Sequence, residues 1–365
     1  MLKKSLYLIS GLTSSLVLLN GCATMAMDKV YLDNPYTYTQ HDTRRGFPQN
    51  LQCPQPPQPT QSMVFDSIYT DRSEGVSIVD EQAQTLYKKQ ISDIRDFEIH
   101  IVGWSNNLAK GKSADMNFCA LTWMHDWAKR DALYGVEESF QGEALRKWAL
   151  ATISTQYSLL SQSVIMPPSD KEEIEDWIKA LADQVMTDYA RYPDNKSRNN
   201  NHMYWAAWGV MAAGFAVNEP EYFNWAVLKY KKGVADIQKD GTLPLELERQ
   251  GRAFLYHNFA LSPLIMMAET AAQNGVDLYG ENNGAIHKLV KRVVTDLDSK
   301  QAYITAKSGK TQDMDGVVTS ASLSWMAPYY KRYKTHSLKK WVKKYEPLKS
   351  SRLGGDLSYL FDVRH

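Results

Sequence analysis

Residues 198–208, Arg-Asn-Asn-Asn-His-Met-Tyr-Trp-Ala-Ala-Trp, combine side chains suited to acid–base chemistry with a helical pattern. The segment runs directly into small apolar residues, so the sequence predicts the polar end of a buried helix. Helical spacing places Asn201, Trp205 and Trp208 on one face, with His202 within i,i+3 reach of Trp205. An amide, an imidazole and two indoles would therefore line the same wall.

A tryptophan stripe at helical spacing is more often core than a binding site, so a second segment is needed to indicate chemistry. Residues 246–258 place Arg249, Arg252 and Tyr256 at i, i+3 and i+7, which would put guanidinium and phenol groups on one helical face. If the two helices are neighbours, this face would lie opposite the amide and the imidazole.

Several segments together resemble the alginate lyases of polysaccharide lyase family 5, the poly(β-D-mannuronate) lyases. They follow the family's order from about residue 53 to residue 360, so the resemblance covers nearly the whole mature chain. The matching segments are residues 119–124, 146–150, 200–208, 243–249, 252–253, 256–258 and 352–355. The resemblance implies an all-α fold, an incomplete (α/α) barrel or toroid of antiparallel helical hairpins. It also implies β-elimination of a β-1,4-linked uronan that leaves a 4,5-unsaturated end.

The four candidate catalytic residues suit this reaction, which removes the C5 proton of a uronate and expels the 4-O-linked sugar. A second negative charge would build up beside the carboxylate, so that carboxylate must be neutralised. Arg249 and Asn201 are suited to bind it, with His202 beside them. Tyr256 is the candidate proton carrier, because nearby cations favour a phenolate and a phenol can also protonate the departing oxygen.

The sequence leaves the identity of the base open. In mannuronate the C5 hydrogen and the leaving oxygen lie on the same side of the ring, so Tyr256 could serve both. In guluronate they lie on opposite sides, and His202 could take the proton while Tyr256 protonates the leaving group.

Aromatic and arginine side chains elsewhere are candidates for the sugar subsites, because indoles stack on sugar faces and arginines pair with carboxylates. These substrate-binding candidates are Tyr69, Arg72, Arg146, Trp148, Trp205, Arg252, His257 and Arg352. By resemblance, residues 65–80 form a lid that carries the first two to the sugar. Ile68 stands where the family commonly has a lysine, so one positive contact to a uronate is absent and the preferred uronic acid stays open.

The N-terminus predicts export and anchoring. Residues 1–21 contain two early lysines, a short apolar run and a small-residue end, which are the features of a signal peptide. Residues 19–22, Leu-Asn-Gly-Cys, resemble a lipoprotein box in which Cys22 is lipidated; an ordinary signal peptide is the alternative. Residues 22–61 are polar and rich in proline and tyrosine, so we interpret them as a lipid anchor and flexible tether. The expected location is the periplasm, anchored to the outer membrane.

Two cysteines remain after Cys22. A disulfide between Cys53 and Cys119 fits both an oxidising compartment and the resemblance; two free buried thiols are the alternative.

Residues 62–365 show no composition break and predict one helical domain. Apolar residues recur at helical spacing in 82–109, 114–132, 140–162, 170–191, 199–216, 220–238, 248–273, 284–299, 318–334 and 337–346. Ser169 and Asn218, each with a glutamate three residues later, predict N-terminal caps. No alternating strand pattern is convincing.

Charge and motifs exclude several classes of function. The whole chain has 42 basic and 41 acidic residues; removal of residues 1–21, which hold two lysines and no acid, leaves 40 and 41. A basic field that would recruit nucleic acid is therefore absent. The eight histidines are scattered and no metal-binding or phosphate-binding motif occurs, so we expect neither metal nor cofactor, and a monomer.

Three other functions stay open at this stage. One is a hydrolase that uses Asp240 or Glu246 to activate water. Another is a uronan-binding lipoprotein without catalysis, and the third is a lyase for a different uronan such as glucuronan.

Overall fold

The computed structural model describes residues 31–37, 45–69, 78–111, 115–135 and 137–363. The predicted signal peptide and Cys22 lie outside these residues, as does Arg72. The described residues belong to one compact unit. Among the described residues, no helix has the length and apolar content needed to span a membrane.

Helices dominate this unit, which confirms the all-α prediction. The long helices are α1 (Glu81–Gln90), α2 (Ser92–Ala109), α3 (Asp115–Ala128), α4 (Phe140–Ser161), α5 (Pro168–Ala190), α6 (Asn201–Val217), α7 (Pro220–Ala235), α9 (Ala253–Gln273), α10 (Glu281–Asp298) and α13 (His336–Tyr345). Shorter helices are α8 (Pro244–Leu247), α11 (Ala302–Ser308), α12 (Met326–Tyr333) and α14 (Leu357–Leu360), with 3-10 turns η1 (Lys196–Arg198), η2 (Gln250–Arg252) and η3 (Ser351–Leu353). The strands are two-residue pairs, β1 (Arg45–Gly46) with β2 (Val164–Ile165) and β3 (Lys349–Ser350) with β4 (Gly355–Asp356).

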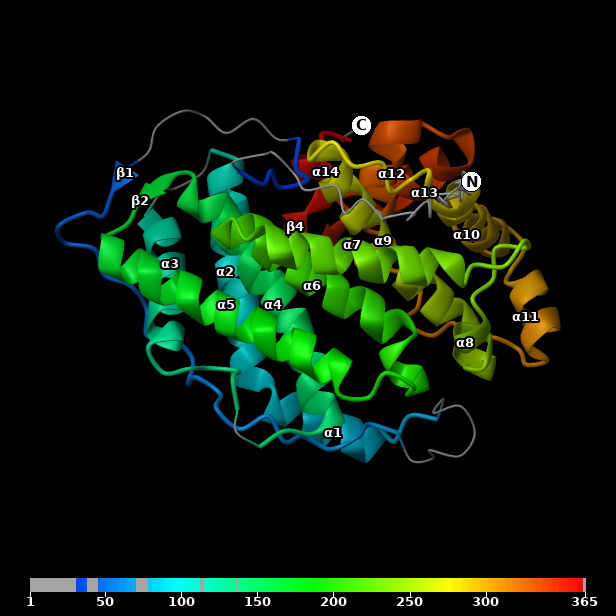
Figure 1. The fold of residues 1–365 in the computed structure, drawn as a ribbon, viewed down its shortest axis with the longest axis horizontal. Helices are drawn as coiled ribbons and strands as arrows, with labels where there is room; N and C mark the ends of the chain where they lie inside the picture. The colour runs from blue at the N-terminus through cyan, green and yellow to red at the C-terminus, as the bar shows by residue number, and fades with distance from the viewer. Residues whose placement is uncertain (1–30, 38–44, 70–77, 112–114, 136, 364–365) are drawn as a thin grey trace, which may run out of the picture. The chain divides into compact units, whose positions relative to one another are not determined.

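Helix α6 lies at the centre of the fold, in contact with α4, α5, α7 and α9 (Figure 1). Every side chain from Met203 to Phe215 is buried, as expected for a helix that is apolar on all sides. Short connections join α4 to α5 and α6 to α7, so these pairs run antiparallel as hairpins of the predicted (α/α) barrel. Gly209 permits the closest approach of α6 to α4, because a Cβ there would lie 2.8 Å from the Lys147 carbonyl oxygen.

Several predicted helix boundaries were wrong. The pattern over 82–109 is two helices, because Ile91 has φ −98° and ψ 11° and ends α1. The pattern over 318–334 forms a helix only in Met326–Tyr333. Asn218 ends α6 in the left-handed conformation instead of starting α7, and α5 begins at Pro168 without a side-chain cap. In both places, proline at the first helical position set the start of the helix.

The disulfide between Cys53 and Cys119 is present, as predicted. It attaches the end of the predicted tether to α3. Two indoles of the same helix strengthen the attachment: Trp123 Nε1 donates to the Pro54 carbonyl oxygen at 2.8 Å, and Trp127 Nε1 donates to that of Pro57 at 3.1 Å. Residues 53–57 are thus held against α3.

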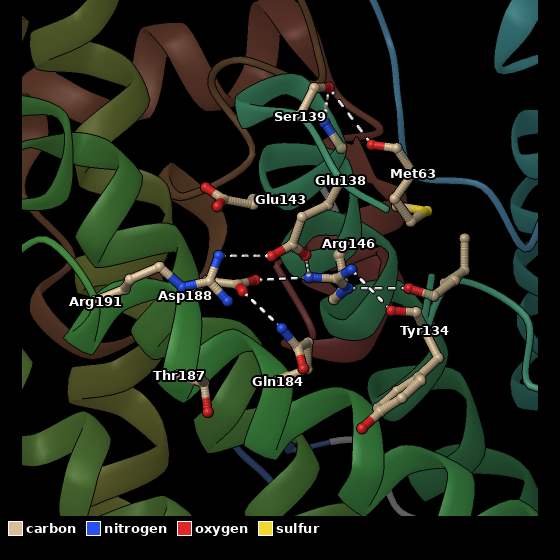
Figure 2. Close-up of polar contacts among 12 residues, drawn as sticks. Met63, Tyr134, Glu138, Ser139, Glu143, Arg146, Gln184, Thr187, Asp188 and Arg191 are labelled. Atoms are coloured by element: carbon tan, nitrogen blue, oxygen red, sulfur yellow. Dashed lines mark hydrogen bonds and ion pairs between the residues drawn. The ribbon is translucent and has the colours of Figure 1, made fainter. Parts of the chain in front are cut away.

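Arg146 ties α4 to α5 through a buried network (Figure 2). Its side chain is 0% exposed, and Nη1 lies 2.7 Å from both Glu138 Oε2 and Asp188 Oδ2. Its Nε and Nη2 donate to the carbonyl oxygens of Leu133 and Tyr134. The prediction that Arg146 contacts the sugar is therefore wrong, because every part of its guanidinium is engaged inside the protein.

Arg146→Met is expected to lower the free energy of unfolding by about 3–5 kcal/mol, because two carboxylates lose their buried partner. The folded variant should keep the KM of the parent. Denaturant unfolding and steady-state kinetics measure the two effects.

Arg191→Met is the matched control. Arg191 bonds to the same Glu138 at 2.9 Å, but its side chain is 41% exposed, so the expected loss is below about 1 kcal/mol. An Arg146→Met protein of unchanged stability with a raised KM would contradict the structural role.

Candidate functional site

The N-terminus of α6 presents Asn201 and His202 at one end of the apolar helix. Asn200 caps this end by accepting a hydrogen bond from the His202 N–H at 2.9 Å. The Asn201 N–H donates to Glu246 Oε1 at 2.7 Å, and its side-chain Nδ2 donates to both oxygens of Glu246 at 3.0 Å. Glu246 belongs to α8, so this carboxylate fixes α8, and the chain that follows it, against α6.

Arg249 and Tyr256 follow Glu246 in the chain and lie against each other. The Arg249 guanidinium carbon lies 3.8 Å from the centroid of the Tyr256 ring, and the Tyr256 hydroxyl lies 2.7 Å from that of Tyr69. Arg252 lies 5.8 Å from the Tyr256 ring and 5.7 Å from the Tyr69 ring. Three chain segments thus meet at one phenol.

The predicted single helical face for these three residues is not what brings them together. Helix α9 begins only at Ala253, and Arg249 precedes the 3-10 turn η2. Gln250 has φ 49°, a left-handed residue inside the turn. The turn folds Arg249 back over the tyrosine ring, a contact that helical spacing alone would not give.

Aromatic rings connect the two halves of the site. The His202 ring lies 6.1 Å from that of Trp148, and the Trp205 ring lies 4.8 Å from that of Phe259. Phe259 in turn contacts Tyr256 edge-on at 6.5 Å. The predicted residues Trp148 and Trp205 are therefore part of one wall that runs from His202 to Tyr256.

Arg352 enters this wall from the far end of the chain. Its guanidinium carbon lies 4.2 Å from the Trp148 ring and 5.8 Å from the Trp205 ring. The Trp208 indole N–H donates to the Arg352 carbonyl oxygen at 2.7 Å, which positions the backbone of this arginine. Trp208 thus supports the site from the core and does not line it.

His257 was predicted to contact the sugar, and the structure contradicts this. Its side chain is 0% exposed, Nδ1 donates to the Ala253 carbonyl oxygen, and Nε2 accepts from the Leu243 N–H. Burial lowers the pKa of His257 to about 4, so the ring is neutral. Its function is to hold the loop before α8 against α9.

Burial dominates the protonation of the two candidate proton carriers. It raises the pKa of Tyr256, with Tyr69 adding to the effect, and outweighs the opposing influence of Arg249 and Arg252. The two arginines thus favour the phenolate, as expected, but burial outweighs them and Tyr256 is a phenol in the free protein. Burial lowers the pKa of His202 well below its usual value, with Lys147 and Arg249 adding to the effect. His202 is thus a neutral imidazole.

One group of carboxylates in the described part of the chain has the spacing of a metal site. Ligand oxygens of Glu138, Glu143 and Asp188 lie within 4.8 Å of one another. Arginines already occupy the space between them: Arg146 binds the first and the third, and Arg198 binds Glu143. The three acids therefore serve an ion-pair network, whose cations are guanidinium groups.

Glu246 is the site residue that sequence reasoning did not place correctly, since it appeared only as a candidate for a hydrolase. It is fully buried, bonded to Asn201 and lines a cavity of about 390 Å³ with Tyr204, Lys232 and Asp236. Burial raises the pKa of Glu246 to about 7, although the Asn201 bonds and Arg249 oppose this.

This raised pKa predicts a pH-dependent stability difference between Glu246→Gln and the parent. Protonation of Glu246 favours the folded state, so its contribution is full below the ordinary pKa of a glutamate and is lost as pH rises through about 7. The melting temperature of the variant minus that of the parent should therefore increase between roughly pH 5 and pH 8. Calorimetry across this range measures it.

Glu248→Gln, at an exposed residue of the same segment, removes the same charge and is the control. A difference for Glu246→Gln that stays constant with pH would show that Glu246 ionises as it does in the unfolded chain.

Comparisons with known proteins agree with this geometry. The sequence profile of the alginate lyase family matches residues 68–303. An alginate lyase of Azotobacter vinelandii is 35% identical over 332 residues, which cover 89% of this chain and 87% of the relative. One from Pseudomonas paraeruginosa is 37% identical over 316 residues, 85% of each chain. The crystal structure of alginate lyase A1-III from Sphingomonas species A1 superposes with a TM-score of 0.70 at 26% identity, covering 84% of this chain and 85% of that one. The chain described here therefore belongs to the alginate lyase family.

Proposed function

We propose that this protein is a lyase that cleaves alginate by β-elimination at mannuronate residues. The observation that carries the proposal is the contact of Arg249 with Tyr256, at 3.8 Å, beside the α6 end that holds Asn201 and His202. A guanidinium, an amide, an imidazole and a phenol are the groups that elimination from a uronate requires. The known relatives named alginate lyase support the same reaction class.

In the proposed reaction, Arg249 and the N–H donors beside it bind the carboxylate of the sugar and stabilise the charge that develops on it. Tyr256, as a phenolate, takes the C5 proton. The electron pair of the C5–H bond forms the C4=C5 double bond while the C4–O bond breaks. Tyr256 then returns the proton to the departing oxygen, so the enzyme ends in its starting state.

The phenolate needed for this step is opposed by burial in the free protein and favoured by two arginines. Tyr69 is the hydrogen-bond partner of the reacting oxygen at 2.7 Å and can donate to the phenolate.

Mannuronate is the proposed substrate because its C5 hydrogen and its leaving oxygen lie on the same side of the ring. The Tyr256 phenol can then reach both. Guluronate would need a base on the opposite side of the ring, for which His202 is the available group. A related structure supports binding of an oligosaccharide: a tyrosine-to-phenylalanine variant of alginate lyase A1-III is complexed with a tetrasaccharide, with a TM-score of 0.73 at 25% identity. Ile68 stands where the family commonly has a lysine, so one positive contact to a uronate is absent and the uronic acid preference needs the substrate panel below.

The proposal includes the location of the protein. Residues 1–21 would direct export, and Cys22 would carry the lipid that anchors a monomer to the outer membrane in the periplasm. Labelling with a radioactive fatty acid, lost in a Cys22→Ser variant, would test the anchor.

Tyr256→Phe and His202→Ala are each expected to remove most turnover, by about 10²–10³-fold or more in kcat, with binding largely retained. Arg249→Ala should lower kcat and raise KM, since it removes both carboxylate binding and charge stabilisation. Ultraviolet absorbance of the C4=C5 product measures turnover. Near-full activity of Tyr256→Phe would remove Tyr256 from the reaction.

A panel of polymannuronate, polyguluronate, glucuronan and hyaluronan tests the substrate. Polymannuronate should give unsaturated product faster than the other three. Shortened chains without ultraviolet absorbance would instead indicate a hydrolase, and binding without shortening would indicate a uronan-binding lipoprotein.

A further inference from the structure

Lys147 is a buried lysine without a carboxylate partner. It lies in α4 with a side chain that is 0% exposed, and no described carboxylate forms an ion pair with it. The nearby acids Glu143 and Asp188 are bound by Arg198 and Arg146 instead. Lysines are almost never fully buried unless they are paired, so this one needs another explanation.

An imidazole nitrogen and two aromatic faces surround the Lys147 amine. Nζ lies 2.9 Å from His202 Nδ1, 4.7 Å from the centroid of the Trp148 ring and 5.6 Å from that of Tyr189. An ammonium has three donors and no acceptor, and aromatic faces attract N–H groups. The amine is thus placed to donate to the lone pair of His202 Nδ1, with two aromatic faces beside it.

We propose that Lys147 is a positioning residue that fixes the tautomer of His202, with Nδ1 bare and the hydrogen on Nε2. The packing holds this contact in place. Gly209 lets α6 approach the α4 backbone at Lys147, and the Phe140 ring lies 5.2 Å from the His202 ring. The partly exposed His202 makes no other side-chain hydrogen bond to a described residue, so Nε2 is left for a ligand.

This tautomer determines which role His202 can take in the reaction. That consequence for catalysis rests on the proposed function. A neutral imidazole with a hydrogen on Nε2 has no lone pair there and cannot take the C5 proton. It can donate a hydrogen bond to the sugar carboxylate beside Arg249. Lys147 thereby leaves Tyr256 as the base and restricts fast elimination to sugars whose C5 hydrogen and leaving oxygen share one side.

Protonation of both ring nitrogens is opposed from every side of the imidazole. Burial lowers the pKa of His202 most, and Lys147 from α4, Arg249 from the segment after α8 and Arg198 from η1 add to the effect. The His202 ring therefore stays neutral, and the Lys147 amine determines which of the two neutral tautomers is present.

Nitrogen-15 NMR of the histidine-labelled, folded protein reads the tautomer without any substrate. The His202 signals are assigned by their absence in His202→Gln. We expect a hydrogen on Nε2 and a bare Nδ1 in the parent, and a shift toward the other tautomer in Lys147→Met, which keeps the length of the side chain and removes its donors. Lys171→Met, at an exposed lysine of α5 that pairs with Glu175, is the control and should leave the His202 signals unchanged.

A second comparison does not depend on the folding of Lys147→Met. The amide nitrogen of a glutamine reaches the position of Nε2 and donates, but it cannot act as a base. His202→Gln should therefore keep at least about tenfold more kcat/KM on polymannuronate than His202→Ala, since one donor is worth about 10²–10³-fold.

A parent spectrum with the hydrogen on Nδ1 would overturn the inference, and so would an Nε2 hydrogen that persists in a folded Lys147→Met. Equal loss of activity in His202→Gln and His202→Ala would mean that His202 is not a donor. If the parent cleaved no uronan at all, the proposed function would fail while the spectra still decided the tautomer.

Discussion

Burial of α6 is the constraint on which the rest of the structure depends. Because its residues from Met203 to Phe215 are buried on all sides, the helix must be surrounded by α4, α5, α7 and α9. Only its N-terminus is polar, and there the helix needs partners for its free N–H groups. Asn200 and the Glu246 carboxylate supply them, and this requirement brings α8, Arg249 and α9 to the same end of the helix.

The same burial sets the charge states of the site. Desolvation is the largest influence on the pKa values of Tyr256, His202, Lys147 and Glu246, and in each case it disfavours the charged form. Groups that would be ordinary in water are therefore held close to neutrality next to arginines. An entering uronate would meet hydrogen-bond donors and fixed guanidinium charges in a region of low dielectric, where each interaction is stronger than at the surface.

Positive charge at the site is a local property. The whole chain has a formal net charge of +1, yet Arg249, Arg252 and Arg352 all lie against the aromatic rings of the site. These contacts hold the guanidinium groups in place without neutralising them. By contrast, Arg146 and Arg198 form buried ion pairs with carboxylates and stabilise the scaffold. Arg146 and Arg198 thus serve the scaffold through their ion pairs, whereas Arg249, Arg252 and Arg352 lie against the aromatic rings of the site.

The sequence alone determined the helical class, because apolar period is a local property, and together with the family resemblance it led us to expect the disulfide and the grouping of Asn201, His202, Arg249 and Tyr256. It did not separate Arg146 and His257 from the sugar-contacting candidates, since their partners on α5 and near α8 are distant in the chain. It gave no sign of Lys147, whose contact with His202 exists only because α4 and α6 pack closely at Gly209. Which arginines form buried ion pairs, and which nitrogen of His202 carries the hydrogen, were decided by tertiary structure, because both depend on atoms that only helix packing brings within hydrogen-bonding distance.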